Sequence, residues 1–355
     1  MNKESARKVY IDFIRMIAIY LVLFNHTGAN GFVLFTVERD SILYPFYLFN
    51  GIFVKIAVPL FFMTSGALLL GKQESIKTIL TKRFLRFAVV LLLGSVIAYA
   101  YECLRISPQE MSLLTFARIL YGGQHTVAYW YLYAYLAFLL MLPFLRRLAQ
   151  SMSFGEYIWM FLMYGFIQSL SILDCMVSAG SGTHNEFFSF FITTRYVFFP
   201  LMGYFIDQKL EEKHFCKRNL TIMGLASFAA ILISCVMTHY WCSLTGLWDQ
   251  DSCQKFFNTL IFLPAVTVFY GTKFLFLRYP FSSRTKSWIT TLGGTTFGLY
   301  LIEQICRHET RKIFTFLQPY LHTLPACWIW IGAACCLGMA VTWFLKKIPG
   351  VEKFI

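Results

Sequence analysis

The feature that most constrains this chain is the recurrence of apolar stretches near the length needed to cross a bilayer. A transmembrane helix needs about 20 predominantly apolar residues, because each residue adds about 1.5 Å to a hydrocarbon core of about 30 Å. Within the 355 residues, stretches of this kind lie at 8–28, 44–71, 83–101, 128–145, 154–173, 187–207, 219–240, 255–275, 289–307 and 325–346. The sequence therefore predicts an all-α, polytopic membrane protein with about ten transmembrane helices.

Composition supports this prediction over a soluble fold. The chain is 57% hydrophobic and 14% charged, whereas a soluble domain is about 25% charged. The net charge of +13 does not indicate nucleic-acid binding, because no long basic stretch stands apart from a hydrophobic segment. With no evident repeat, low-complexity segment or linker, residues 1–355 are predicted to form a single membrane domain.

The loop charges predict the orientation. Lys and Arg gather at both termini and in alternate loops, at 72–83, 146–147, 209–218 and 273–286. Cytoplasmic loops are enriched in basic residues, so an even number of helices with both termini cytoplasmic is expected. The loop 303–324 does not fit, because its basic residues would lie outside. A function there, or an interfacial helix, would explain it.

The first apolar stretch carries ionisable residues. Asp12 and Arg15 lie inside it and no small-residue cleavage site ends it, so we interpret it as a retained helix rather than a signal peptide. Arg15 and His26 are eleven residues apart, about 20° beyond three full turns and about 16 Å along the axis. Both should therefore share one face, with Arg15 in the cytoplasmic half and Asp12 close enough to pair with it.

Two interpretations of these residues stay open. Ionisable groups within a span usually face a cavity or a partner and mark functional sites. Alternatively, Asp12 and Arg15 are interfacial side chains and His26 caps the end of the helix. The same holds for Arg83 and Arg86, which are three apart at the start of the third stretch. They could grip phosphates or could be ordinary cytoplasmic anchors.

Prolines and cysteines add local expectations. Pro59 and Pro200 should kink or break their helices, and Ser65 is expected at a helix break rather than as a nucleophile. The ten cysteines form no metal-binding pattern. Cys242 and Cys253 would share an outside loop, where they could form a disulfide.

The ordered set of motifs resembles the acyltransferase-3 family of membrane acyltransferases, mainly bacterial enzymes that modify cell-surface molecules. The resemblance covers nearly the whole chain and is carried by Asp12, Arg15 and His26; by Pro59 to Gly66; by Arg83 and Arg86; and by Trp130 to Tyr133. The chain departs from the family at two positions. Ala128 and Glu303 stand where many members have His, although His125 lies near the first of them. No extracellular hydrolase-like domain is expected.

The resemblance implies a function in the bacterial cell membrane. An acyl-CoA, expected to be acetyl-CoA, would dock from the cytoplasm with its phosphates on Arg83 and Arg86. His26 would act as general base toward a hydroxyl of a cell-surface or lipid-linked carbohydrate. Arg15, fixed by Asp12, would stabilise charge or orient the donor. No metal is implied, and surface-glycan assembly proteins are further expected partners.

Two other functions compete with this one. Charges inside the membrane also mark transport pathways, so a transporter or flippase that performs no acyl transfer is the main alternative. A structural subunit of a glycan-assembly complex is the other, and it would leave the charged first helix unexplained. Consumption of acyl-CoA separates an enzyme from both.

Overall fold

The computed structural model describes residues 7–178, 194–249, 251, 254 and 256–354. All regular secondary structure of these residues is helical, as predicted. The chain divides into two compact units, each built from two separate stretches. Unit 1 comprises Met1–Lys72 and Leu145–Gly293, and unit 2 comprises Gln73–Phe144 and Gly294–Ile355.

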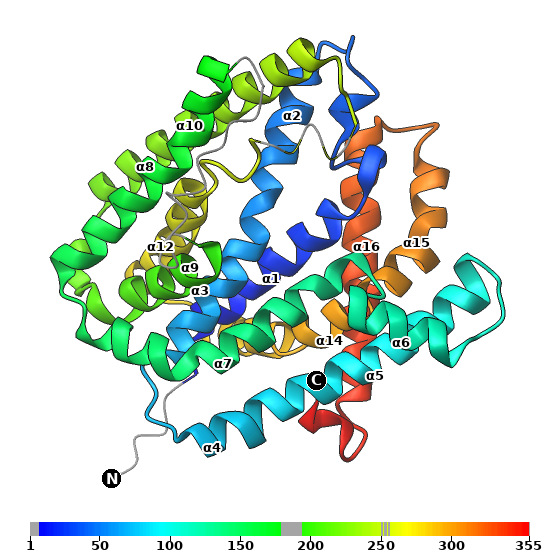
Figure 1. Ribbon diagram of the computed structural model, residues 1–355, viewed down its shortest axis with the longest axis horizontal. Coiled ribbons are helices and arrows are strands. Elements are labelled where there is room, and N and C mark those ends of the chain that lie inside the picture. Colours follow the sequence, from blue (N-terminus) through cyan, green and yellow to red (C-terminus); the bar gives the residue numbers. More distant parts are fainter. Residues whose placement is uncertain (1–6, 179–193, 250, 252–253, 255, 355) are drawn as a thin grey trace. The chain divides into compact units, whose positions relative to one another are not determined.

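Unit 1 contains the first helix of the chain and most of the described helices (Figure 1). These are α1 (Val9–Asn25), α2 (Tyr44–Phe53), α3 (Ala57–Leu69), α8 (Phe154–Ser178), α9 (Arg195–Tyr204), α10 (Lys217–Thr245), α12 (Phe262–Arg278) and α13 (Ser283–Gly293). A 3₁₀ turn at Val54–Ile56 separates α2 from α3. A π-helical turn at Phe205–Lys209 extends α9.

The helices α3 and α9 pack with their backbones in contact, and a glycine on each helix permits it. A Cβ added to Gly66 would lie 1.9 Å from the carbonyl oxygen of Pro200, and one added to Gly203 would lie 2.0 Å from that of Met63. Only a residue without a side chain fits at such distances, and small residues at helix crossings are the usual basis of close packing in membranes. This crossing fixes the centre of unit 1.

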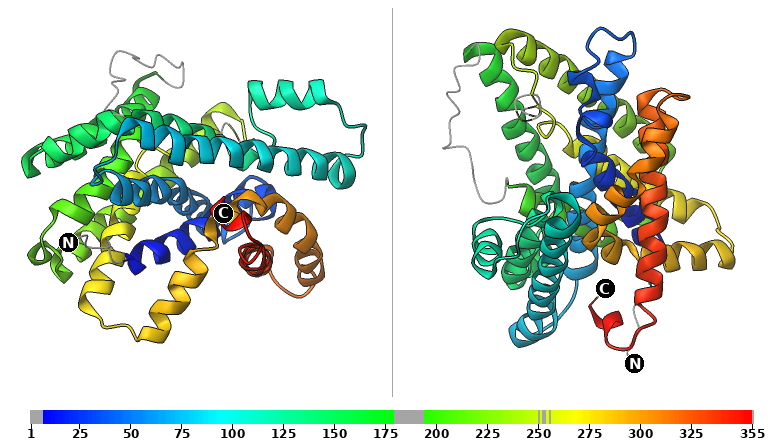
Figure 2. Two further views of the ribbon diagram at one scale, coloured as in Figure 1. Left: turned by 90° about the horizontal axis from the view of Figure 1, so that it is seen from below. Right: turned by 90° about the vertical axis from the view of Figure 1, so that its right-hand side faces the viewer.

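Unit 2 consists of a helical stretch from α4 (Ile76–Thr78) to a π-helical turn at Glu102–Ile106, followed by α6 (Leu113–Gly122), and a C-terminal group of helices. That stretch includes a π-helical turn at Ile79–Phe84 and α5 (Leu85–Tyr101). The C-terminal group is α14 (Thr296–Leu301), α15 (Glu303–Leu317) and α16 (Thr323–Leu345). Figure 2 shows α15 in orange beside α16 in red, and the two helices are in contact. The boundary between the units falls within α7 (Trp130–Ser151).

Five helical stretches among the described residues are long and apolar enough to cross a membrane. They are Tyr44–Leu69, Ile76–Ile106, Val127–Ser151, Lys217–Thr245 and Thr323–Leu345. Each coincides with a predicted span, so the protein is a multi-pass membrane protein. The total of about ten spans and the cytoplasmic position of both termini stay predictions, as does the single domain 1–355. The predicted pairing of Cys242 with Cys253 involves a residue outside the described part of the chain.

The local expectations agree with the structure only in part: the helix is interrupted close to Pro59, but not at Ser65. The break in the second apolar stretch lies at Val54–Ile56, just before Pro59. Ser65 instead lies within α3, where its hydroxyl donates to the carbonyl of Phe61 at 2.8 Å. The helix α9 continues through Pro200, whose ring removes one hydrogen bond but does not end the helix.

The predicted span 289–307 is also interrupted, because α13 ends at Gly293 and α15 begins only at Glu303. The sequence Gly-Gly-Thr-Thr at 293–296 lies at the first interruption. Glycine and β-branched residues are poor helix formers, which accounts for the break. The basic residues that did not fit the loop-charge pattern lie on α15, so the part of that loop from Glu303 to Leu317 is helical.

Candidate functional site

At the N-terminal end of α1, one buried carboxylate is shared by two arginines. Asp12 is 3% exposed. Arg7 Nε donates to Asp12 Oδ2 at 2.7 Å, while Arg15 Nη1 lies 3.7 Å from Asp12 Oδ1. The predicted pairing of Asp12 with Arg15 is therefore present, but the shorter bond comes from Arg7. Sequence reasoning placed Arg7 only among the cytoplasmic basic residues.

The helix α13 also contacts Asp12 and Arg7. A Cβ added to Gly293 would lie 2.5 Å from the Cβ of Asp12, so α13 can approach α1 this closely only with glycine at that position. Arg7 Nη2 also donates to the carbonyl of Thr290 at 2.7 Å. Arg7 thus links the carboxylate of α1 to the backbone of α13, and the position of Asp12 depends on both helices.

His26 lies at the opposite end of α1, immediately after its last residue, Asn25. Its backbone N–H donates to the carbonyl of Leu23 at 3.2 Å, and its side chain is half-buried. The next residue closes the helix end, because Thr27 Oγ1 donates to the carbonyl of Phe24 at 2.7 Å and accepts from the backbone N–H of Phe32 at 2.9 Å. His26 is therefore held on an ordered turn.

Most of the segment between Arg15 and His26 is helical. Ten of the eleven steps between them lie within α1, so they are about 16 Å apart along its axis. His26 itself has left the helical conformation, with φ −96° and ψ 12°. If His26 is the general base, the base is the first side chain after the end of α1. The structure brings Asp12 and Arg15 into contact, whereas no described contact joins either of them to His26.

In unit 2, the two arginines of the third apolar stretch differ from each other. Arg83 Nε and Nη2 donate to the two carboxylate oxygens of Glu74 at 2.9 and 2.6 Å. Arg86 is exposed and lies three residues after Arg83 in the same helical stretch. The two arginines are therefore neighbours, but Arg83 already forms a bidentate ion pair with Glu74. Glu74 carried no signal in the sequence beyond being a loop carboxylate.

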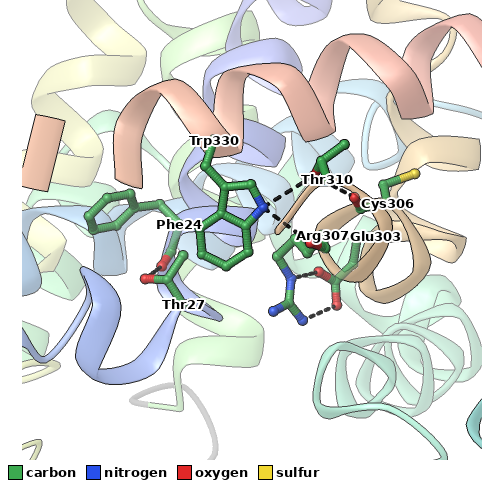
Figure 3. A network of polar contacts seen from close by, with 7 residues as sticks. All are labelled: Phe24, Thr27, Glu303, Cys306, Arg307, Thr310 and Trp330. Atoms are coloured by element: carbon green, nitrogen blue, oxygen red, sulfur yellow. Dashed lines mark hydrogen bonds and ion pairs between the residues drawn. The ribbon is translucent and has the colours of Figure 1, made fainter. Parts of the chain in front are cut away.

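A second buried carboxylate lies in unit 2 at the start of α15 (Figure 3). Glu303 is 1% exposed and pairs with Arg307, with Nε donating to Oε2 at 2.5 Å. Trp330 Nε1 donates to the carbonyl of Arg307 at 3.1 Å and lies 3.2 Å from the hydroxyl of Thr310. These bonds tie α15 to α16. The pair spans four residues of one helix, so its spacing could have indicated it from the sequence.

The tyrosines around the Trp-Tyr-Leu-Tyr string connect it to the region of Glu303. Tyr129 donates its hydroxyl hydrogen to the carbonyl of Leu301 at 2.7 Å, and Tyr300 donates to the carbonyl of Ala128. At Ala128 the chain thus contributes a backbone acceptor. His125 stacks on Phe116, with ring centroids 4.8 Å apart; its contact there is aromatic packing.

The predicted residues are distributed over both units: Asp12, Arg15 and His26 belong to unit 1, and Arg83 and Arg86 to unit 2. Chemically, the first group offers an arginine on α1 and a histidine just beyond its end, and the second offers two guanidiniums. Among the described residues, no cluster of three or more His, Cys, Asp or Glu side chains is placed to hold a metal ion.

Comparison of the sequence with known families identifies the family of this chain. The model of the acyltransferase-3 family, described as an acyltransferase domain, matches residues 8–347. No curated protein and no solved structure matches the chain. The matched range includes α1 with its charged residues and every further residue predicted for the site. The chain therefore belongs to the acyltransferase-3 family of membrane acyltransferases.

Proposed function

We propose that this acyltransferase moves an acetyl group from cytoplasmic acetyl-CoA to a hydroxyl of a cell-surface or lipid-linked carbohydrate, in a bacterial cell membrane. The family and the apolar helices support membrane acyl transfer. The observation that carries the finer proposal is the half-buried imidazole of His26 at the end of α1. Imidazole is suited to accept a proton near neutral pH.

The proposed reaction is a direct transfer. His26 accepts the hydroxyl proton of the acceptor as its oxygen attacks the thioester carbonyl carbon. A new C–O bond forms, the C–S bond of the thioester breaks, and the CoA thiolate leaves. The proton held by His26 then passes to that thiolate, which regenerates the base. Ser65 takes no part, since its hydroxyl is engaged within α3.

Arg15 is proposed to act on negative charge, either by stabilising the tetrahedral oxyanion or by orienting the donor. Its contact with Asp12 is long, at 3.7 Å, which leaves guanidinium N–H groups for another acceptor. Asp12 holds the side chain in position rather than neutralising it fully. Asp12 is thus a positioning residue in this proposal.

Arg83 and Arg86 are proposed to bind the phosphates of the donor. Arg86 is exposed and offers a guanidinium fork suited to phosphate. Arg83 is oriented by Glu74, so we assign it the smaller share of direct phosphate contact. Its positive charge beside Arg86 still favours a polyanionic ligand.

Replacement of the base tests the function. We expect His26→Ala to lose at least about a hundredfold in acetyl transfer, the lower range for general-base catalysis, measured in membranes with labelled acetyl-CoA. The matched control is His308→Ala, because His308 is an exposed histidine on α15. Wild-type activity in His26→Ala would overturn the assignment. Failure of the wild-type protein to consume any acyl-CoA would instead favour the transporter.

Replacement of the arginines tests donor binding separately. Arg86→Gln should raise the KM for acetyl-CoA about tenfold, the effect of one lost charge-assisted hydrogen bond, while kcat is retained. Arg86→Lys should lie between this variant and the wild type. Lys82→Gln is the control, because it removes a nearby exposed charge. An unchanged KM in Arg86→Gln would return the residue to membrane anchoring.

A further inference from the structure

A lysine lies near the middle of Tyr44–Leu69, the more buried of the two long apolar stretches described in unit 1. Lys55 is in the 3₁₀ turn Val54–Ile56, between α2 and α3 of the 26-residue stretch Tyr44–Leu69. It follows Tyr44 by eleven residues, or about 16 Å along the axis, which is about half of a hydrocarbon core. Ionisable groups at such depth are costly and usually serve a function. Interrupted helices at this depth are typical of binding sites.

The contacts of Lys55 do not neutralise its charge. Its Nζ donates to the side-chain oxygen of Gln254 at 2.7 Å and lies 4.6 Å from the centroid of the Phe32 ring. Both partners are neutral. Within the described part of the chain, no carboxylate forms an ion pair with Lys55. The side chain is half-buried, so a ligand can reach it.

A second cation adds to the first. Arg195, the first residue of α9, lies close enough to Lys55 to repel it electrostatically. The guanidinium of Arg195 is 5.5 Å from the ring centroid of Tyr196, and no carboxylate of the described residues pairs with it. The N-terminus of α9 contributes further positive potential, because the dipole of a helix is positive at that end. Two cations and a helix N-terminus thus share one region of unit 1.

We propose that Lys55 and Arg195 bind an acidic group of the acceptor, either the carboxylate of an acidic sugar or a phosphate of a lipid-linked glycan. An anion would offset the repulsion between the two cations, which is otherwise an unfavourable arrangement in an apolar span. Naming the ligand as the acceptor rests on the proposed function, whereas the anion site is independent of acyl transfer. A neutral sugar would leave both cations uncompensated, so the site would select acidic acceptors.

The test measures binding of three probes to the full-length protein in nanodiscs of phosphatidylcholine. Dodecyl glucuronide and dodecyl phosphate carry the two anionic groups, and dodecyl glucoside is the neutral counterpart of the first. We expect the wild-type protein to bind at least one anionic probe about tenfold more tightly than the glucoside. The preferred anionic probe identifies the source of the anion. Equal binding of all three probes would overturn the proposal.

Variants connect the preference to the two cations. Lys55→Met should abolish the anion preference, Lys55→Arg should keep most of it, and Arg195→Gln should reduce it. Lys213→Met is the matched control, since it removes the charge of an exposed surface lysine and should leave binding unchanged. If Lys55→Met fails to fold, Arg195→Gln, with its exposed side chain, decides. A preference that survives in every foldable variant of Lys55 and Arg195 would overturn the proposal.

The two proposals fail in different ways. His26→Ala should retain the anion preference, because His26 takes no part in the anion site. Anion binding by a protein that transfers no acyl group would sink the acyltransfer chemistry and leave the anion site standing. Acyl transfer by a protein without anion preference would do the reverse.

Discussion

Each unit buries one carboxylate beside arginine, and the two arrangements differ in what they leave available. In unit 2, Glu303 pairs with Arg307 four residues later on the same helix, and Arg307 is 16% exposed. In unit 1, Asp12 receives its short bond from Arg7, before the helix, and a long one from Arg15, which is 34% exposed. The first pair is closed and local, whereas the second keeps an arginine only loosely held.

The difference shows that a buried carboxylate can serve two purposes in a membrane protein. A carboxylate fully paired with one arginine satisfies both groups and makes a rigid joint between helices. A carboxylate shared between two arginines can orient one of them without consuming its hydrogen-bonding capacity. We therefore expect the Glu303 pair to matter mainly for stability and the Asp12 group mainly for activity.

The largest expected effect comes from breaking the closed pair. Glu303→Gln removes the carboxylate that pairs with the partly buried guanidinium of Arg307, and we expect a loss of about 3 kcal/mol in unfolding free energy. The double variant Glu303→Gln with Arg307→Met should recover much of this loss, since no buried charge then remains. Denaturant unfolding in detergent measures both. A double variant that is no more stable than the single one would contradict the closed-pair interpretation.

The second-largest effect is expected from a change in packing beside Asp12, which leaves Glu303 untouched. Gly293→Ala places a Cβ 2.5 Å from the Cβ of Asp12, so α13 must shift away from α1 at a cost of about 1–3 kcal/mol. Because Arg7 is tied to α13 as well, acetyl transfer should fall along with stability. Gly224→Ala is the control, as a Cβ there meets no atom within 4 Å. Unchanged activity in Gly293→Ala would show that α13 does not support the group.

How much of this could be predicted depends on the distance along the chain. The pairing of Asp12 with Arg15 follows from helical spacing, because residues three apart share a face. Helical spacing equally contains the Glu303–Arg307 pair, although sequence reasoning singled out Glu303 only for its departure from the family. Positions within one helix are fixed by its geometry, and the sequence reveals them.

Contacts between different helices and loops could not be predicted from the sequence. The bond of Arg83 to Glu74 crosses a loop, and the approach of Gly293 to Asp12 joins segments almost the whole chain apart. Both are decided by tertiary packing, which hydrophobic periodicity does not encode. The misplaced helix break has a similar cause, since Ser65 can bond within a helix as readily as end one. The sequence did not single out Lys55, because one charged residue barely lowers the mean hydropathy of a long apolar stretch.

The smallest expected effect on stability is the sharpest test of the comparison. Arg7→Met removes the 2.7 Å bond to Asp12, but Arg7 is 54% exposed, so the loss in unfolding free energy should stay below about 1 kcal/mol. Asp12 would then pair fully with Arg15 and draw it from its proposed role. Acetyl transfer should fall several-fold, by more than the stability loss explains, whereas Arg7→Lys should retain part of the activity. Wild-type turnover in Arg7→Met would mean that Asp12 holds Arg15 equally well alone, and the contrast with Glu303 would disappear.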